Sequence, residues 1–152
     1  MLNKEEISEI IRKQIPEVVF SEGTQLFEVI VPADKMFSLA EILKSDPSLA
    51  FDYLISQTAV DYITKMTVVC HLESVKYRHL IVLKSELTDR ENPAIDSLTS
   101  LYPTAEYFER EIFDLFGIRF NNHPNMKRLF LEDDYGYPLR KDFKDEVNII
   151  ER

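Results

Sequence analysis

The segment from Glu109 to Phe143 reads EREIFDLFGIRFNNHPNMKRLFLEDDYGYPLRKDF and is the most informative part of this chain. It begins with the spacing of an amphipathic helix and continues as a charged tail with two prolines and scattered aromatic residues. Such a tail has too few apolar residues to form a core of its own, yet too many to remain fully solvated. The sequence therefore predicts that residues 121–152 complete their fold against another surface, as partner-docking segments do.

The helix that opens this segment is predicted over residues 105–116. Thr104 precedes it in the position of an N-cap, and Gly117 follows it where a left-handed backbone favours glycine. The apolar side chains that share one face of this helix are Ala105, Phe108, Ile112, Leu115 and Phe116. The pattern indicates that this face packs on the body of the protein.

Five charged residues of the same helix permit two interpretations, and they are Glu106, Glu109, Arg110, Glu111 and Asp114. A cluster of carboxylates could serve acid–base chemistry or hold a metal ion. Alternatively, Arg110 pairs with Glu106 and Asp114, each four residues away, in a structural ion-pair line on a solvated or interfacial surface. We favour the structural line, because an arginine among the acids neutralises the charge that a metal site needs.

The chain upstream mixes hairpins with helices, which is typical of an α+β protein. The predicted elements are a helix over 4–14 with a capping box from Asn3 to Glu6, a hairpin of 18–20 and 26–31 around Ser21 to Thr24, a helix over 32–44, an extended segment over 51–62, central strands over 66–73 and 77–83, and a helix from Asn92-Pro93 to about 101. After Ile118 we expect at most one short strand. The prediction is a mixed, mainly antiparallel sheet with about four helices in a core domain of residues 1–120, followed by an irregular docking segment of residues 121–152.

Composition excludes several classes of partner and site. The net charge of −9 argues against nucleic acid and against a polybasic lipid-binding surface. Cys70 is the only cysteine, so an internal disulfide or a cysteine-ligated iron–sulfur cluster is excluded, and a reducing compartment is the simplest expectation. No apolar run reaches the length of a membrane span, and the first residues lack the order of a signal peptide. We expect no direct membrane insertion.

The spaced residues of segment 109–143 also resemble a known family. The matching residues are Glu109-Arg110-Glu111, Asp114 to Ile118, Phe120, His123-Pro124, Arg128 and Pro138 to Asp142. This set resembles the signature of the 30-kilodalton or C-type subunit of respiratory complex I, the proton-pumping NADH:quinone oxidoreductase. Upstream, residues 51–54 and 59–62 are similar, more loosely, to the strand by which that family enters its sheet.

The resemblance implies a scaffold subunit in the hydrophilic arm of that complex, which passes electrons from NADH to quinone and translocates protons. In the family this scaffold has no flavin, iron–sulfur cluster or quinone pocket, and its C-terminal segment lies on the quinone-site subunit, with iron–sulfur subunits in the same assembly. We therefore expect no catalytic, cofactor-binding or metal-binding residue in this chain. The residues expected at the partner interface are His123, Arg128, Tyr137, Pro138, Leu139, Arg140, Lys141 and Asp142.

Two other functions remain open from the sequence. One is the corresponding subunit of a membrane-bound, energy-converting nickel–iron hydrogenase. The other is a stand-alone enzyme that uses Glu109, Glu111 and Asp114. In the first and favoured interpretation, the protein is peripheral on the cytoplasmic side of the bacterial inner membrane and is held there by its partners.

The histidines and the cysteine invite functional interpretations, but structural ones fit the sequence better. His123 before Pro124 is expected to fix a turn through a backbone hydrogen bond. His71 and His79 would face each other on paired strands if the turn between them is short, but Cys70 and His71 are adjacent and point to opposite faces of a strand, so they cannot easily share a metal ion. Cys70 is expected to be a small buried apolar residue.

Overall fold

The computed structural model describes residues 2–22 and 26–145. Within these residues the protein has three α-helices, one 3-10 helix and seven strands. They are α1 (Lys4–Gln14), β1 (Val19–Glu22), β2 (Phe27–Ile30), η1 (Ala33–Lys35), α2 (Met36–Ser45), β3 (Tyr53–Asp61), β4 (Met66–Ser74), β5 (His79–Leu87), β6 (Ala94–Asp96), α3 (Ala105–Phe116) and β7 (Arg119–Asn121). The turn of the first hairpin, predicted over Ser21 to Thr24, lies partly outside the described residues.

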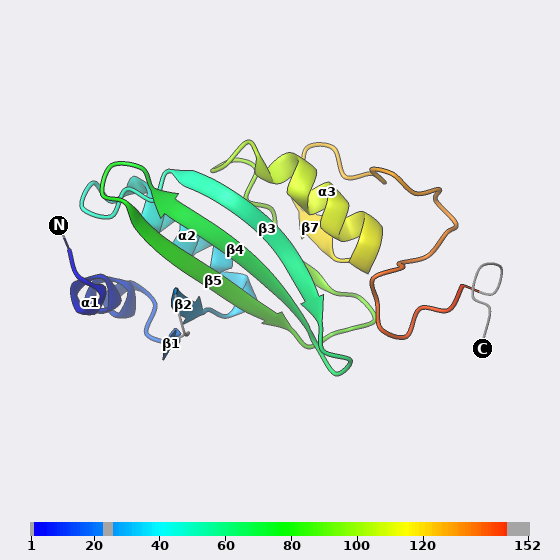
Figure 1. Ribbon diagram of the computed structural model, residues 1–152, viewed down its shortest axis with the longest axis horizontal. Coiled ribbons are helices and arrows are strands. Elements are labelled where there is room, and N and C mark those ends of the chain that lie inside the picture. Colours follow the sequence, from blue (N-terminus) through cyan, green and yellow to red (C-terminus); the bar gives the residue numbers. More distant parts are fainter. Residues whose placement is uncertain (1, 23–25, 146–152) are drawn as a thin grey trace.

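The main sheet has five strands in the order β1-β2-β5-β4-β3. The pairs β1–β2, β5–β4 and β4–β3 are antiparallel, whereas β2 and β5 are parallel. This confirms the predicted mixed, mainly antiparallel sheet, and it confirms that β4 and β5 are central. In Figure 1 the long strands β3, β4 and β5 lie in front, with α2 behind them and α3 beside β3.

The core lies between the sheet and its helices, and alternate strand residues supply it. Met66, Val68, Cys70 and Leu72 of β4 are buried, and so are Ile81 and Leu83 of β5. Cys70 is fully buried, and burial raises the pKa of its thiol. It therefore packs as a small apolar residue, as the sequence predicted.

Two helices begin and end where the sequence predicted. Asn3 accepts a hydrogen bond from the Glu6 amide at 2.9 Å and donates its own amide to Glu6 at 2.7 Å, which completes the capping box of α1. Helix α3 ends at Gly117, whose φ of 73° lies in the left-handed region. Thr104, however, has helical backbone angles and makes no side-chain cap, so the predicted N-cap of α3 is not formed.

The helix predicted from Asn92-Pro93 to about residue 101 was wrong. Strand β6 occupies residues 94–96 and pairs in parallel with β7, a partner more than twenty residues further along the chain. Next, the amide of Leu98 donates to the buried carboxylate of Glu109 at 2.7 Å instead of closing a helical turn. The described chain therefore has three α-helices and one 3-10 helix in place of about four helices, while the α+β class is confirmed.

The two strand histidines do not face each other. In the β4–β5 register His71 lies opposite Val82, and His79 lies opposite Ser74. The Nδ1 atom of His71 instead lies 3.2 Å from the Ser56 hydroxyl. The register therefore separates the two imidazoles on which a shared metal site would depend.

Candidate partner interface

The candidate site is the tail, which we define as residues 122–145. It contains no helix or strand, and it occupies the end of the molecule beyond α3, opposite the end that holds α1 (Figure 1). The predicted docking segment also includes residues 146–152, which lie outside the described residues. The contacts of residues 122–145 show how the chain holds its tail.

The first contact between the tail and α3 is made by His123. Its Nδ1 atom accepts the amide of Asn125 at 3.0 Å, so Nε2 carries the proton and donates to the Glu106 carbonyl at 3.0 Å. The imidazole therefore fixes a turn, as the sequence indicated. Its side chain is 0% exposed, so the ring of His123 lies inside this chain and not at the surface predicted for it.

One helical turn further along α3, Arg110 holds the next part of the tail. Its Nε and Nη2 atoms donate to the carbonyls of Lys127 and Arg128 at 3.3 and 3.0 Å. Its guanidinium also lies 6.0 Å from the centre of the Tyr107 ring. Arg110 therefore binds the backbone of its own tail.

Another turn along, Asp114 binds the tail through a negative charge. Its Oδ2 atom accepts the amides of Phe130 and Leu131 at 2.8 and 3.2 Å, and Oδ1 accepts Arg128 at 3.2 Å. Arg128 also donates to the carbonyls of Asp114 and Gly136 at 2.7 and 2.8 Å. Since the Asp114 side chain is fully buried, these bonds form in a region shielded from water.

The predicted ion-pair line is therefore present as a row of residues but not as a row of ion pairs. Within the described chain, no ion pair joins Arg110 to Glu106 or Asp114. Glu109, Arg110 and Asp114 are buried rather than solvated, and Glu111 is exposed. Spacing alone placed Glu106, Arg110 and Asp114 along one side of the helix, but it did not reveal that the tail covers that side.

Glu109 joins α3 to the body from another side. Its carboxylate accepts the Leu98 amide at 2.7 Å, the Ser97 hydroxyl at 2.6 Å and the Gln57 amide at 3.4 Å. Burial raises the pKa of Glu109, and the hydrogen bonds from Ser97 and Leu98 oppose that rise. Its neighbour His123 lies 3.9 Å away. The carboxylate is enclosed and saturated with donors, which suits a structural role.

The later part of the tail returns to the C-terminal end of α3. The amide of Leu139 donates to the Leu115 carbonyl at 3.0 Å, and Nε of Arg140 donates to the Phe116 carbonyl at 2.6 Å. The guanidinium of Arg140 also stacks 4.9 Å from the centre of the Tyr137 ring. Arg140 therefore uses its Nε atom within its own chain, which excludes a side-on fork through Nε and Nη2 to a partner carboxylate.

Gly117 makes this return possible. A Cβ atom at this position would lie 2.7 Å from Cε2 of Tyr137 and 2.8 Å from Nη2 of Arg140. Its positive φ already disfavours any side chain. Gly117 thus ends the helix and also leaves room for the tail.

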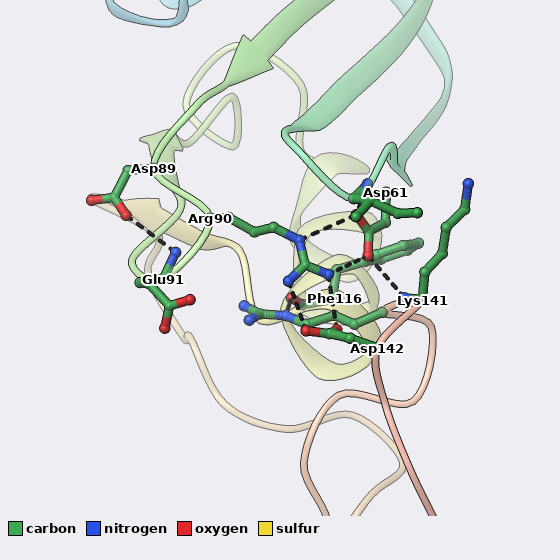
Figure 2. A network of polar contacts seen from close by, with 9 residues as sticks. Asp61, Asp89, Arg90, Glu91, Phe116, Lys141 and Asp142 are labelled. Carbon is green, nitrogen blue, oxygen red and sulfur yellow. Dashed lines mark hydrogen bonds and ion pairs between the residues drawn. The ribbon is translucent and has the colours of Figure 1, made fainter.

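Arg90 fastens the tail to the sheet (Figure 2). Its guanidinium donates to Oδ2 of Asp61 at 2.7 Å and to both carboxylate oxygens of Asp142 at 2.8 Å. The Lys141 amide donates to Oδ2 of Asp61 at 2.8 Å. We call Asp61, Arg90 and Asp142 the Arg90 bridge. It joins the end of β3, the loop after β5 and the tail at one point.

The Arg90 bridge predicts a dependence of stability on pH. The hydrogen bond from Arg90, with help from the Lys141 amide, lowers the pKa of Asp61 from 3.8 to about 2. Because the unfolded chain binds the proton more readily, this stabilisation is complete above about pH 5 and is lost as pH falls through 2. We expect the stability difference between the wild type and Asp61→Asn to shrink by about 2 kcal/mol over that range, measured by urea unfolding. A constant difference would contradict this role of Asp61.

The eight residues predicted at the interface divide into inward and outward groups. The side chain of His123 is buried, while Arg128, Tyr137, Pro138 and Arg140 are partly buried against the body; Leu139, Lys141 and Asp142 are exposed. The sequence reasoning missed Arg90 and gave Asp61 no role, although Asp61 is a carboxylate at the end of a predicted strand. It also missed Phe130, which is 75% exposed.

The described residues show no arrangement that calls for a metal. Among residues 2–22 and 26–145, no group of three or more His, Cys, Asp or Glu side chains is placed to hold an ion. None of the helices described combines the length and the hydropathy needed to cross a membrane. Two surface hollows lie beside α1 and the first hairpin, where Lys4, Leu26 and Phe27 line them, away from the tail.

Comparison with known proteins decides the family. Residues 29–147 match the family described as "Respiratory-chain NADH dehydrogenase, 30 Kd subunit". The chain belongs to this family. The match confirms the resemblance carried by segment 109–143. It runs from within β2 through β7, so family membership rests on the sheet as well as on the tail.

Two relatives match this chain over most of their length. The C subunit of NADH-quinone oxidoreductase from Moorella thermoacetica is 40% identical over 137 residues, which is 88% of this chain and 90% of that protein. The C subunit of NADH-quinone oxidoreductase from Roseiflexus sp. (strain RS-1) is 37% identical over 147 residues, 93% of this chain and 84% of that protein. These two relatives are therefore similar in extent as well as in sequence.

Two further comparisons concern a much longer protein and a solved structure. The C/D subunit of NADH-quinone oxidoreductase from Phocaeicola vulgatus is 42% identical over 120 residues, which cover 78% of this chain but only 23% of that protein. The structure of the membrane-bound sulfane sulfur reductase, an archaeal respiratory membrane complex, contains a chain with a TM-score of 0.79 and 29% identity. That alignment covers 94% of this chain and 86% of the other.

Proposed function

We propose that this chain is a scaffold subunit, without a redox cofactor of its own, in the hydrophilic arm of an NADH:quinone oxidoreductase. The observation that best supports this proposal is a tail held firmly on α3 and by the Arg90 bridge, yet exposing Phe130, Leu139 and Lys141 outward. A surface fixed in this way is preorganised for binding, which lowers the entropic cost of association. We propose residues 121–152 as the docking segment on a core of residues 1–120.

The proposed main partner is the D-type subunit, which we take to be the quinone-site neighbour implied by the family. The protein of Phocaeicola vulgatus supports this choice, because its name joins the C and D subunits in one polypeptide. Two parts of one polypeptide remain at high effective concentration, which favours parts that work in contact. Iron–sulfur subunits of the same complex complete the proposed set of partners.

The chemistry is proposed to take place in those partners, which would carry the flavin and the iron–sulfur clusters. In this chain a lone buried cysteine cannot supply the thiolates that hold a cluster. Electron transfer from NADH to quinone, coupled to proton translocation, would then depend on this chain for assembly rather than for turnover. We propose a peripheral position on the cytoplasmic side of the membrane, held through the partners.

A second candidate is the corresponding subunit of another membrane-bound respiratory complex. The similarity to a chain in the sulfane sulfur reductase structure favours it, since that complex is named neither for NADH nor for quinone. An energy-converting nickel–iron hydrogenase belongs to the same alternative. A stand-alone enzyme fits less well, because Glu109 and Asp114 are enclosed and bonded to their own chain while Glu111 is exposed elsewhere on α3.

Affinity purification from the source organism tests the proposed function. The tagged full chain is expected to bring down a D-type subunit and iron–sulfur subunits from detergent-solubilised membranes, identified by mass spectrometry. The chain purified alone is expected to oxidise no NADH. Recovery of a nickel–iron large subunit would favour the second candidate, and turnover by the isolated chain would overturn the scaffold role.

A further inference from the structure

Phe130 is an aromatic side chain presented to solvent on a fixed backbone. It is 75% exposed, more than any other large apolar side chain in the described part of the protein. Its amide is nevertheless held by the buried carboxylate of Asp114 at 2.8 Å, and the next amide, of Leu131, is held at 3.2 Å. The backbone that carries the ring is therefore fixed, while most of the ring is open to solvent.

An exposed ring on a fixed backbone offers apolar surface that a partner can bury. Exposed phenylalanine loses the free energy of burial, which favours any contact that removes the ring from water. Binding recovers that free energy, and the held backbone means that little further conformational entropy is lost. Aromatic residues presented in this way are the residues that dominate binding at protein interfaces.

The side chains that follow Phe130 indicate the charge of its partner. Glu132, Asp133 and Asp134 are consecutive, acidic and exposed. Within residues 2–22 and 26–145, none of these three carboxylates takes part in a hydrogen bond or an ion pair. Three adjacent carboxylates without an ion-pair partner among the described residues repel one another, and a partner with basic side chains around its contact surface would relieve that repulsion.

We propose that Phe130 is the apolar anchor of the docking surface, and that it enters an apolar pocket of the D-type subunit rimmed by basic side chains that face residues 132–134. This inference rests on the proposed function and deepens it by naming the point of contact. In this proposal the outward-facing Phe130 contributes more to the binding free energy than the arginines of the tail, which face this chain. The acidic residues would steer the encounter, and Phe130 would slow dissociation.

The test compares variants of the tagged full chain in the source organism. Phe130→Ala is expected to reduce recovery of the D-type subunit about tenfold or more, since it removes an anchor but leaves the Asp114 hydrogen bonds in place. The double variant with Asp133→Lys and Asp134→Lys is expected to recover less D-type subunit than the wild type, and this loss should grow as the salt concentration is lowered. The wild type, in contrast, should bind more tightly at low salt. Tyr53→Ala, which removes a half-exposed aromatic from β3, is the matched control and should not change recovery.

The outcomes separate this inference from the proposed function. If the wild-type chain recovers no D-type subunit, the proposed function fails. If the wild type recovers it and Phe130→Ala recovers it equally well, only the anchor is refuted. The assignment would also be overturned if Phe130→Ala reduced recovery of an iron–sulfur subunit but not of the D-type subunit. A dimer of this chain that Phe130→Ala dissociates in gel filtration would overturn it as well. Unchanged thermal unfolding of Phe130→Ala would show that the loss is one of binding.

Discussion

Replacing Asp114 with alanine is expected to destabilise the protein by about 3–5 kcal/mol and to free the first part of the tail from α3. The substitution leaves the amides of Phe130 and Leu131 without their buried acceptor, and it leaves Arg128 without its carboxylate. Each unpaired buried group carries a desolvation cost of about 1–3 kcal/mol. Urea unfolding measures the loss, and amide hydrogen exchange at residues 130 and 131 shows where it occurs.

The same helix provides the control for this experiment. Glu111 is a carboxylate on α3 that is exposed, so Glu111→Ala is expected to change stability by no more than about 0.5 kcal/mol. Asp114→Asn keeps the shape but replaces one acceptor oxygen with a donor. It should therefore recover only part of the loss. Equal effects of Asp114→Ala and Glu111→Ala would show that the tail does not depend on the buried carboxylate.

Replacing Arg90 with alanine is expected to cost about 3 kcal/mol or more and to detach the later part of the tail. Asp61, whose side chain is 1% exposed, would lose its charged partner and keep only donors such as the Lys141 amide. Its pKa, now about 2, should rise toward the ordinary value. NMR titration of the Asp61 carboxyl and hydrogen exchange at Lys141 measure these two consequences separately.

Two further variants distinguish the bridge from ordinary surface charge. Arg90→Lys retains the positive charge but cannot fork between Asp61 and Asp142, so it should recover less than half of the lost stability. Lys65→Ala removes the partly exposed pair with Glu86 and should cost less than about 1 kcal/mol. If Arg90→Ala behaves like Lys65→Ala, the Arg90 bridge does not secure the tail.

Local sequence was sufficient for the start of α1 and the end of α3, although the N-cap predicted at Thr104 is not formed. The capping box at Asn3 and the left-handed Gly117 mark the limits of α1 and α3, because both signals act within a few residues. The helix expected around residues 93–101 failed for the opposite reason. Asn92-Pro93 resembles a helix start, but pairing with β7 and the hydrogen bond from Leu98 to Glu109 lie in contacts that no local pattern contains.

The docking role of the tail stays a prediction, but the structure shows how its side chains are oriented. The signature singled out this segment as a candidate interface, and within it Leu139 and Lys141 are exposed. The same signature suggested that Arg128 and Arg140 reach outward, whereas both donate to carbonyls of their own chain. The sequence shows that each arginine needs hydrogen-bond acceptors, but it does not show whether those acceptors lie in the same molecule.

The order in which the chain is made gives the Arg90 bridge a further consequence. Asp61 and Arg90 are synthesised long before Asp142, so the folded body can form while the tail is still emerging. The later part of the tail can then close on a surface that already exists. A copy that ended before residue 142 would therefore have a folded body and an unfastened later tail, so its proposed docking surface would be incomplete.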